Sequence, residues 1–161
     1  MIKPNKLLVL LNDLEKQGNF DELYQTLDLY QDNQKLSSTV NYFRGHLVFD
    51  AINEEKDLEK AYEYFNNAYA LDKEPHAAYY LSKKAEGEND INLANDLLFI
   101  SASSDFPPAL NDLGVLYLTG RGYFKQNIEV AVELITRSAD YGYPYAQINF
   151  ANYYILNTDD E

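Results

Sequence analysis

Cysteine is absent from this 161-residue sequence, and histidine, another common metal ligand, occurs only twice. Without cysteine there can be no disulfide framework, zinc ribbon, iron–sulfur site or thiol nucleophile, and nothing indicates an oxidising compartment. The two histidines, His46 and His76, are thirty residues apart, and neither has a second histidine at helical spacing. A metal site would need carboxylates alone, so we predict no bound metal.

Basic residues are also few. There are 13 Lys and Arg against 26 Asp and Glu, which gives a net charge of −13. Binding to nucleic acid or to an anionic membrane requires a basic face, so we expect neither partner. A basic protein is the natural complement of such a chain, although acidity can also serve solubility alone.

Long hydrophobic runs are missing as well. The apolar run at 7–11 is five residues long, whereas a signal peptide needs about 7–15 apolar residues and a membrane span about 20. We therefore expect a soluble, cytoplasmic protein. Apolar residues nevertheless make up 46% of the chain, with 15 Tyr and 8 Phe, which excludes a disordered chain.

The sequence does contain an internal repeat. Similar residues recur at a spacing of 37 positions, as in the pairs Ala94/Ala131, Ala109/Ala146, Leu113/Phe150 and Gly114/Ala151. Earlier pairs such as Ala77/Ala109 are 32 positions apart. Periods of about 32–37 residues indicate stacked helical hairpins.

Helical periodicity and helix-end signals support that interpretation. Leu7, Leu11 and Leu14 form one apolar stripe, and Asp57 and Asp90 stand where helix N-caps are expected. Strand-like alternation is hard to find. We expect nine helices, at 5–17, 21–31, 38–53, 57–71, 75–86, 90–103, 107–119, 127–141 and 144–157.

The segment 109–122, which reads Ala-Leu-Asn-Asp-Leu-Gly-Val-Leu-Tyr-Leu-Thr-Gly-Arg-Gly, resembles the first helix and glycine loop of a Sel-1-like repeat. Ala131, Ala139, Tyr141-Gly142 and Ala146 continue that pattern. Segments 37–73 and 75–105 look closer to tetratricopeptide repeats, with Gly45 and Ala61 in key positions.

The resemblance implies an all-α fold, a right-handed α-α superhelix of about four helical hairpins plus a C-terminal capping helix. We expect a single repeat domain, 1–161, with approximate repeats 5–36, 37–73, 75–105 and 107–142 and the capping helix 144–157.

Small residues fall where the two helices of one hairpin must approach closely, at Gly45, Ser82, Gly114 and Ala151. Bulky residues beside them fill the remaining space. Gly120 and Gly122 allow the loop after 107–119 to adopt positive φ, and Gly142 fits a left-handed helix end.

Motifs that carry chemistry are weak in this sequence. The acidic stretch 86–90 lacks the spacing of a calcium loop and is interpreted as a solvated turn. The Gly120-x-Gly122 pair follows no strand and has no third glycine, and the serines at 101–104 lack a nucleophile-elbow context. We therefore predict no catalytic residue and no cofactor.

Tyrosines give the main indication of a partner. Tyr42 and Tyr79 come shortly before the small residues of their helices, and the resemblance implies that this side of the first helix lines the concave surface. Exposed aromatic side chains anchor interfaces, whereas core packing is the alternative role. The predicted partner-binding residues are Tyr42, His46, Tyr79, Lys83, Asn111 and Asn152.

Three functional classes stay open. The first is an immunity or antitoxin-like protein that neutralises a basic, nuclease-type toxin, as some families with these repeats do. The second is a peptide-binding adaptor or regulator in a bacterial signalling or envelope pathway, and the third and weakest is an enzyme. A homo-oligomer is not predicted, although Ile148, Tyr153, Ile155 and Leu156 on the last helix could either cap the solenoid or pair with another copy.

Overall fold

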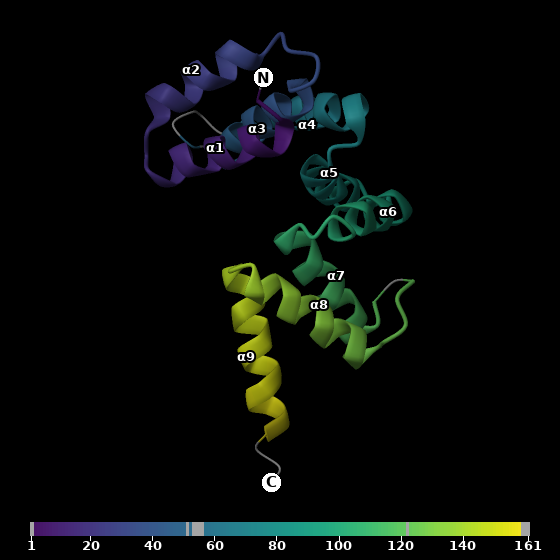
Figure 1. Cartoon of the computed structure of the whole chain (residues 1–161). Coiled ribbons are helices and arrows are strands. Elements are labelled where there is room, and N and C mark those ends of the chain that lie inside the picture. Colours follow the sequence, from purple (N-terminus) through teal and green to yellow (C-terminus); the bar gives the residue numbers. More distant parts are fainter. Residues whose placement is uncertain (1, 51, 53–56, 122, 159–161) are drawn as a thin grey trace. The chain divides into compact units, whose positions relative to one another are not determined.

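The computed structural model describes residues 2–50, 52, 57–121 and 123–158, with the side chains of 154 and 156–158 left aside. The described part of the chain is built from α-helices and contains no β-strand (Figure 1). The helices are α1 (Pro4–Lys16), α2 (Phe20–Tyr30), α3 (Ser37–Phe49), α4 (Leu58–Asp72), α5 (Pro75–Gly87), α6 (Ile91–Ala102), α7 (Pro107–Thr119), α8 (Ile128–Asp140) and α9 (Pro144–Thr158). The all-α prediction is confirmed.

Local sequence signals explain most helix ends. The side chain of Asp57 accepts a hydrogen bond from the Lys60 backbone N–H at 3.0 Å and so begins α4, and Asp90 begins α6 in the same way. Gly142 follows Tyr141, the C-cap residue of α8, and has φ +83°, as expected for a glycine that ends a helix. Gly120 also has positive φ, whereas Gly122 lies outside the described residues. One predicted boundary is wrong, because α3 ends at Phe49 rather than at residue 53.

The chain divides into two compact units, an N-terminal unit of residues 1–81 and a C-terminal unit of residues 82–161. Each unit is described by itself. In each unit two consecutive helices pack closely against each other, α3 with α4 and α7 with α8. The single domain 1–161 and its repeat boundaries stay predictions.

In the N-terminal unit, α3 packs against α4 at the position where the sequence has a glycine. A Cβ atom on Gly45 would lie only 2.7 Å from Cε1 of Phe65 and 3.2 Å from the Ala61 carbonyl oxygen. Phe43, Phe65, Leu7, Leu11 and Leu27 are fully buried and form the core of this unit. The small residue therefore sets the distance between the two helices.

The C-terminal unit repeats this arrangement in α7 and α8. A Cβ atom on Gly114 would lie 2.7 Å from Cγ1 of Ile135 and 3.1 Å from the Ala131 carbonyl oxygen. The buried Ser138 hydroxyl donates a 2.6 Å hydrogen bond to the Pro107 carbonyl oxygen and ties the end of α8 to the start of α7. Helix α9 then packs on α8, with Ala146 fully buried.

The predicted close contact at Ala151 is not formed. Gly45, Ser82 and Gly114 are buried, but Ala151 is exposed. The physical reason is that no helix in the described part of the chain follows α9 and covers this position. None of the helices in the described ranges combines the length and apolar character needed to cross a membrane.

Candidate functional site

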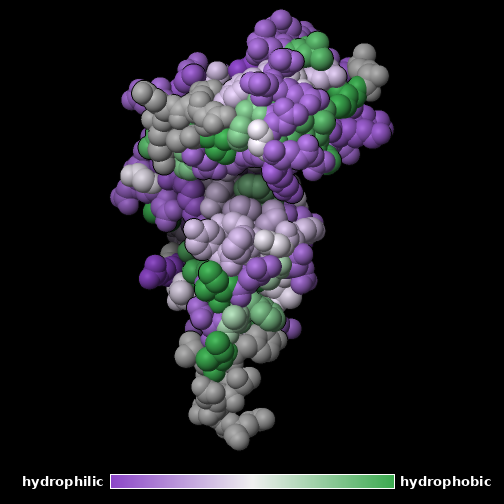
Figure 2. Space-filling view, turned by 90° about the vertical axis from the view of Figure 1, so that its left-hand side faces the viewer, coloured by the Kyte–Doolittle hydropathy of each residue, from purple (hydrophilic) through white to green (hydrophobic). Residues whose placement is uncertain are grey.

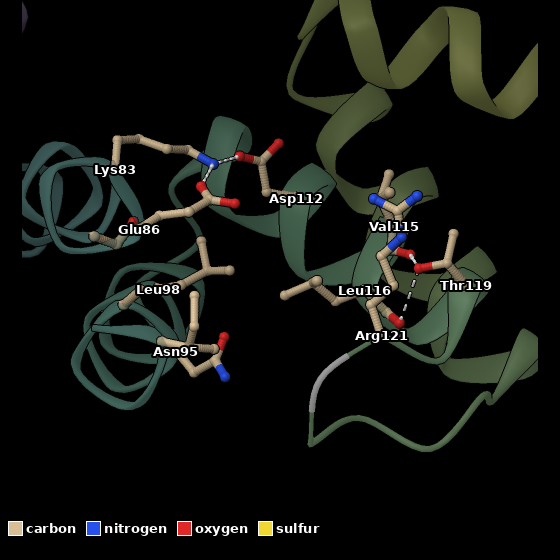
Figure 3. A pocket seen from close by; sticks show the side chains of 12 residues that line it. Lys83, Glu86, Asn95, Leu98, Asp112, Val115, Leu116, Thr119 and Arg121 are labelled. Carbon is tan, nitrogen blue, oxygen red and sulfur yellow. Dashed lines mark hydrogen bonds and ion pairs between the residues drawn. The ribbon is translucent and has the colours of Figure 1, made fainter. Parts of the chain in front are cut away.

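The C-terminal unit contains a pocket of about 490 Å³ between the end of α5, helix α6 and helix α7. Its inner wall is apolar. Figure 3 shows Leu98 from α6 and Leu116 from α7 extending into the space between the two helices, and Ile91, Ala94 and Val115 complete this wall. A volume of this size accommodates a small ligand or a few side chains of another protein.

Charged residues form the rim of the pocket. The Lys83 ammonium on α5 lies 2.5 Å from Oδ2 of Asp112 on α7 and 3.6 Å from Oε2 of Glu86 (Figure 3). Arg121 lies in the loop after α7 and also lines the pocket. The rim therefore presents both signs of charge, with one ion pair that joins two helices.

Asn95 on α6 is the unusual residue of the wall. Its side-chain Nδ2 is buried and has no hydrogen-bond partner within the described residues. An unpaired buried donor costs about 1–3 kcal/mol relative to a bonded one. A ligand that brings a carbonyl or carboxylate oxygen to Nδ2 would recover that free energy.

Of the predicted partner-binding residues, Lys83 lines this pocket and Asn152 on α9 is exposed. Their role in partner binding stays a prediction. Asn111 is only 5% exposed, so its expected exposure is wrong. Its side chain donates to Asp112 Oδ1 at 3.1 Å and accepts from Asn149 Nδ2 at 2.8 Å, which makes it a buried link between α7 and α9.

The N-terminal unit holds the other predicted residues in a polar and aromatic cluster. His46 Nε2 lies 3.2 Å from Oε1 of Glu15, and His46 Nδ1 lies 3.2 Å from Oδ2 of Asp50 and from the Tyr80 hydroxyl oxygen. His46 was expected either to face a partner-binding groove or to cap a contact, and its side chain is only 17% exposed. It therefore connects α1, α3 and α5 inside this unit.

Tyr42 belongs to the core of the same cluster. It is 6% exposed, and its ring lies 5.1 Å from that of His76 and 6.4 Å from that of Phe65. Burial raises the pKa of the Tyr42 phenol well above its usual value, and the neighbouring Tyr80 and nearby carboxylates act in the same direction. The expectation that Tyr42 is an exposed aromatic is wrong, because helix α4 and the start of α5 cover it.

Tyr79 differs from Tyr42. It is partly exposed, and its ring stands edge-on to that of Tyr80 with centroids 5.4 Å apart. This support from a buried neighbour orients the Tyr79 ring while leaving part of it accessible. Of the two tyrosines that the sequence singled out, only Tyr79 is available to a partner.

No group of three His, Asp or Glu side chains in the described ranges is arranged to hold a metal ion. Asn95 and the apolar wall were not predicted from the sequence. The only signal was an amide next to the apolar residue Ala94 on α6, and a spacing pattern cannot reveal that its donor lacks a partner within the described residues.

Among the comparisons with known proteins, only the comparison of structures gives evidence on the fold. No family model matches the sequence, and no curated protein matches it. A solved structure, described as the crystal structure of a Sel1 repeat protein from Oxalobacter formigenes, superposes with a TM-score of 0.68 at 20% sequence identity over 96% of this chain. The chain spans 63% of the length of that protein. This chain therefore has the fold of a Sel1-like helical-repeat protein, an all-α solenoid.

Proposed function

We propose that this chain is a non-enzymatic protein-binding scaffold, and that the pocket of the C-terminal unit holds a segment of the partner. The observation that carries the proposal is the unpaired Nδ2 of Asn95 in a pocket with an apolar wall. A polypeptide supplies both groups that such a pocket needs. One apolar side chain packs between Leu98 and Leu116, and a backbone carbonyl accepts a hydrogen bond from Asn95.

Charge supports a basic partner. Acidic residues outnumber basic residues in both units, and the whole chain carries a net charge of −13. A strongly acidic protein attracts basic proteins over long distances and repels acidic ones. The specific form of the proposal is an immunity protein that neutralises a basic toxin of the nuclease type.

A peptide-binding adaptor or regulator in a bacterial signalling or envelope pathway is the second candidate. The rim of the pocket favours it, since Lys83 and Arg121 balance Glu86 and Asp112 and make this site much less acidic than the chain as a whole. In that case the pocket would select a short segment by shape and hydrogen bonding, with little contribution from overall charge.

Paired affinity captures test the proposal. Wild-type protein and the Asn95→Leu variant are immobilised and exposed to the same lysate of the source organism, and the retained proteins are quantified by mass spectrometry. We expect at least one basic protein to be retained by wild type and lost from the variant. Retention of the same proteins by both baits would contradict a partner site at this pocket.

The salt dependence of that capture separates the two candidates. A neutralised basic toxin would be released as the ionic strength rises, because salt screens exposed charges. A peptide segment held mainly by the pocket would stay bound. Ile128→Ala, at an exposed apolar residue outside the pocket, is the matched control and should retain the same proteins as wild type.

A further inference from the structure

Helix α9 carries an uncharged apolar face that the rest of the C-terminal unit leaves open. No Asp, Glu, Lys or Arg occurs between Pro144 and Thr158, in a chain where 24% of residues are charged. Tyr145, Ile148 and Ile155 are 65%, 56% and 59% exposed. Figure 2 shows green hydrophobic residues at the surface in the lower part of the view, where Figure 1 has α9.

In the α3/α4 and α7/α8 hairpins the corresponding face of the first helix is covered by the second helix. In each hairpin a glycine of the first helix lies against an alanine and a large apolar residue four positions later on the second helix. Gly45 contacts Ala61 and Phe65, and in the other hairpin Gly114 contacts Ala131 and Ile135. The two helices of a hairpin run antiparallel.

Helix α9 contains both halves of this contact. Ala151 occupies the position that Gly114 has in α7, 37 residues earlier, and it is exposed. Ala151 and Ile155 also repeat the spacing of Ala131 and Ile135, the pair that covers Gly114. A surface that carries both halves of a contact is self-complementary, which is what a two-fold interface requires.

We propose that α9 pairs with α9 of a second copy of this chain, antiparallel, about a two-fold axis between Ala151 and Asn152. In each copy Ala151 is the small residue of the contact. The Ala151–Ile155 segment of the other copy packs over it. In this register Ile148 of one copy lies opposite Ile155 of its partner. The two-fold axis repeats this pair, so the dimer contains it two times.

The charge distribution also favours α9 over other surfaces as the place where two copies meet. Two chains that each carry −13 repel one another, so a contact between them is most favourable where neither presents a carboxylate. Helix α9 meets that condition. Phe99, an exposed apolar residue on α6, is by contrast three positions from the carboxylate of Asp96.

The size of the interface sets the expected strength. A pair of single helices buries less than the roughly 800 Å² per partner of a standard interface. We therefore expect a dissociation constant on the order of micromolar rather than nanomolar.

Sedimentation velocity on the 161-residue chain, from about 1 to about 200 μM, tests the proposal in that range. Wild type should shift from monomer to dimer as concentration rises. Ile155→Glu should weaken the dimer about tenfold or more, since it places an unpaired charge in the contact. Phe99→Glu, the matched control on α6, should dimerise like wild type. Far-UV circular dichroism confirms that each variant keeps its helix content.

A charge-pair variant tests the register. In the chain that carries both Ile148→Lys and Ile155→Glu, each lysine faces a glutamate of the partner, so the dimer lost in Ile155→Glu should return. A wild-type protein that stays monomeric to the highest concentration would overturn the proposal. So would a dimer that Ile155→Glu leaves intact, or a double variant as monomeric as the single one.

Discussion

Gly114 lies so close to Ile135 that a single added carbon atom on the glycine would stand 2.7 Å from the Ile135 Cγ1 atom. Gly45 has the same relationship to Phe65 in the N-terminal unit. Each unit therefore contains one helix pair whose separation is set by a missing side chain, and the fold depends on glycine at these two places.

Gly114→Leu should lower the free energy of unfolding by about 1–3 kcal/mol, because the new side chain forces α7 and α8 apart. Chemical denaturation followed by circular dichroism measures this change. Gly87→Ala is the control, since nothing lies within 4 Å of a Cβ atom there. It should be neutral or stabilise the protein by up to about 1 kcal/mol. Equal stability of wild type and Gly114→Leu would show that Gly114 is not at the helix contact.

The buried phenol of Tyr42 should make stability fall at high pH. Its pKa is raised in the folded protein above the unfolded value of about 10. Above that value the unfolded chain releases the proton more readily than the folded chain, so the free energy of unfolding decreases as pH rises toward the folded pKa. Below about pH 10 the phenol is protonated in both the folded and the unfolded chain, so no stability is lost through Tyr42.

Tyr42→Phe should remove this loss of stability, and urea unfolding of both proteins between about pH 8.5 and 11.5 measures the difference. The variant should show a shallower decline than wild type over that range. Parallel declines would mean that another group causes the alkaline sensitivity.

The helices of both units could be predicted from the sequence because the signals that begin and end them are local. The caps Asp57 and Asp90 and the left-handed glycine Gly142 act within one helical turn, so they could be read directly. The small residues Gly45 and Gly114 could be predicted because a repeated pattern marks a repeated contact. The fold follows from signals that neighbouring residues carry.

The candidate site could be predicted only in part. Tyr42 was expected at the surface because it precedes Gly45 on the helix, but His76 and Tyr80, more than thirty residues away, close over its ring. Asn95 was missed because its significance lies in an absent hydrogen bond. Both facts depend on contacts between distant segments, which a single sequence does not specify.

Asn95→Leu should raise the stability of the free protein while it weakens partner binding. The buried Asn95 Nδ2 has no partner within the described residues, so replacing the amide with an apolar group of similar size removes a desolvation cost of about 1–3 kcal/mol. Thermal unfolding measures the first effect and isothermal titration with the captured partner the second. A destabilised variant would indicate that the Asn95 amide makes a bond inside the protein.

Tyr79→Ala should weaken partner binding by about 1–3 kcal/mol if its accessible ring becomes buried at the interface. The helix content should not change, because the ring is only partly buried in the free protein. Tyr123→Ala, at a tyrosine that is 71% exposed in the loop before α8, is the control and should bind normally. Equal loss in both variants would argue against a specific anchor.

The association rate of the captured partner, measured by stopped-flow at about 50 mM and about 500 mM salt, tests the central claim most directly. An acidic scaffold that attracts a basic protein should associate about tenfold or more faster at the lower salt concentration, since electrostatic steering is screened as ionic strength rises. An association rate that does not change with salt, or a captured partner that is itself acidic, would contradict the account.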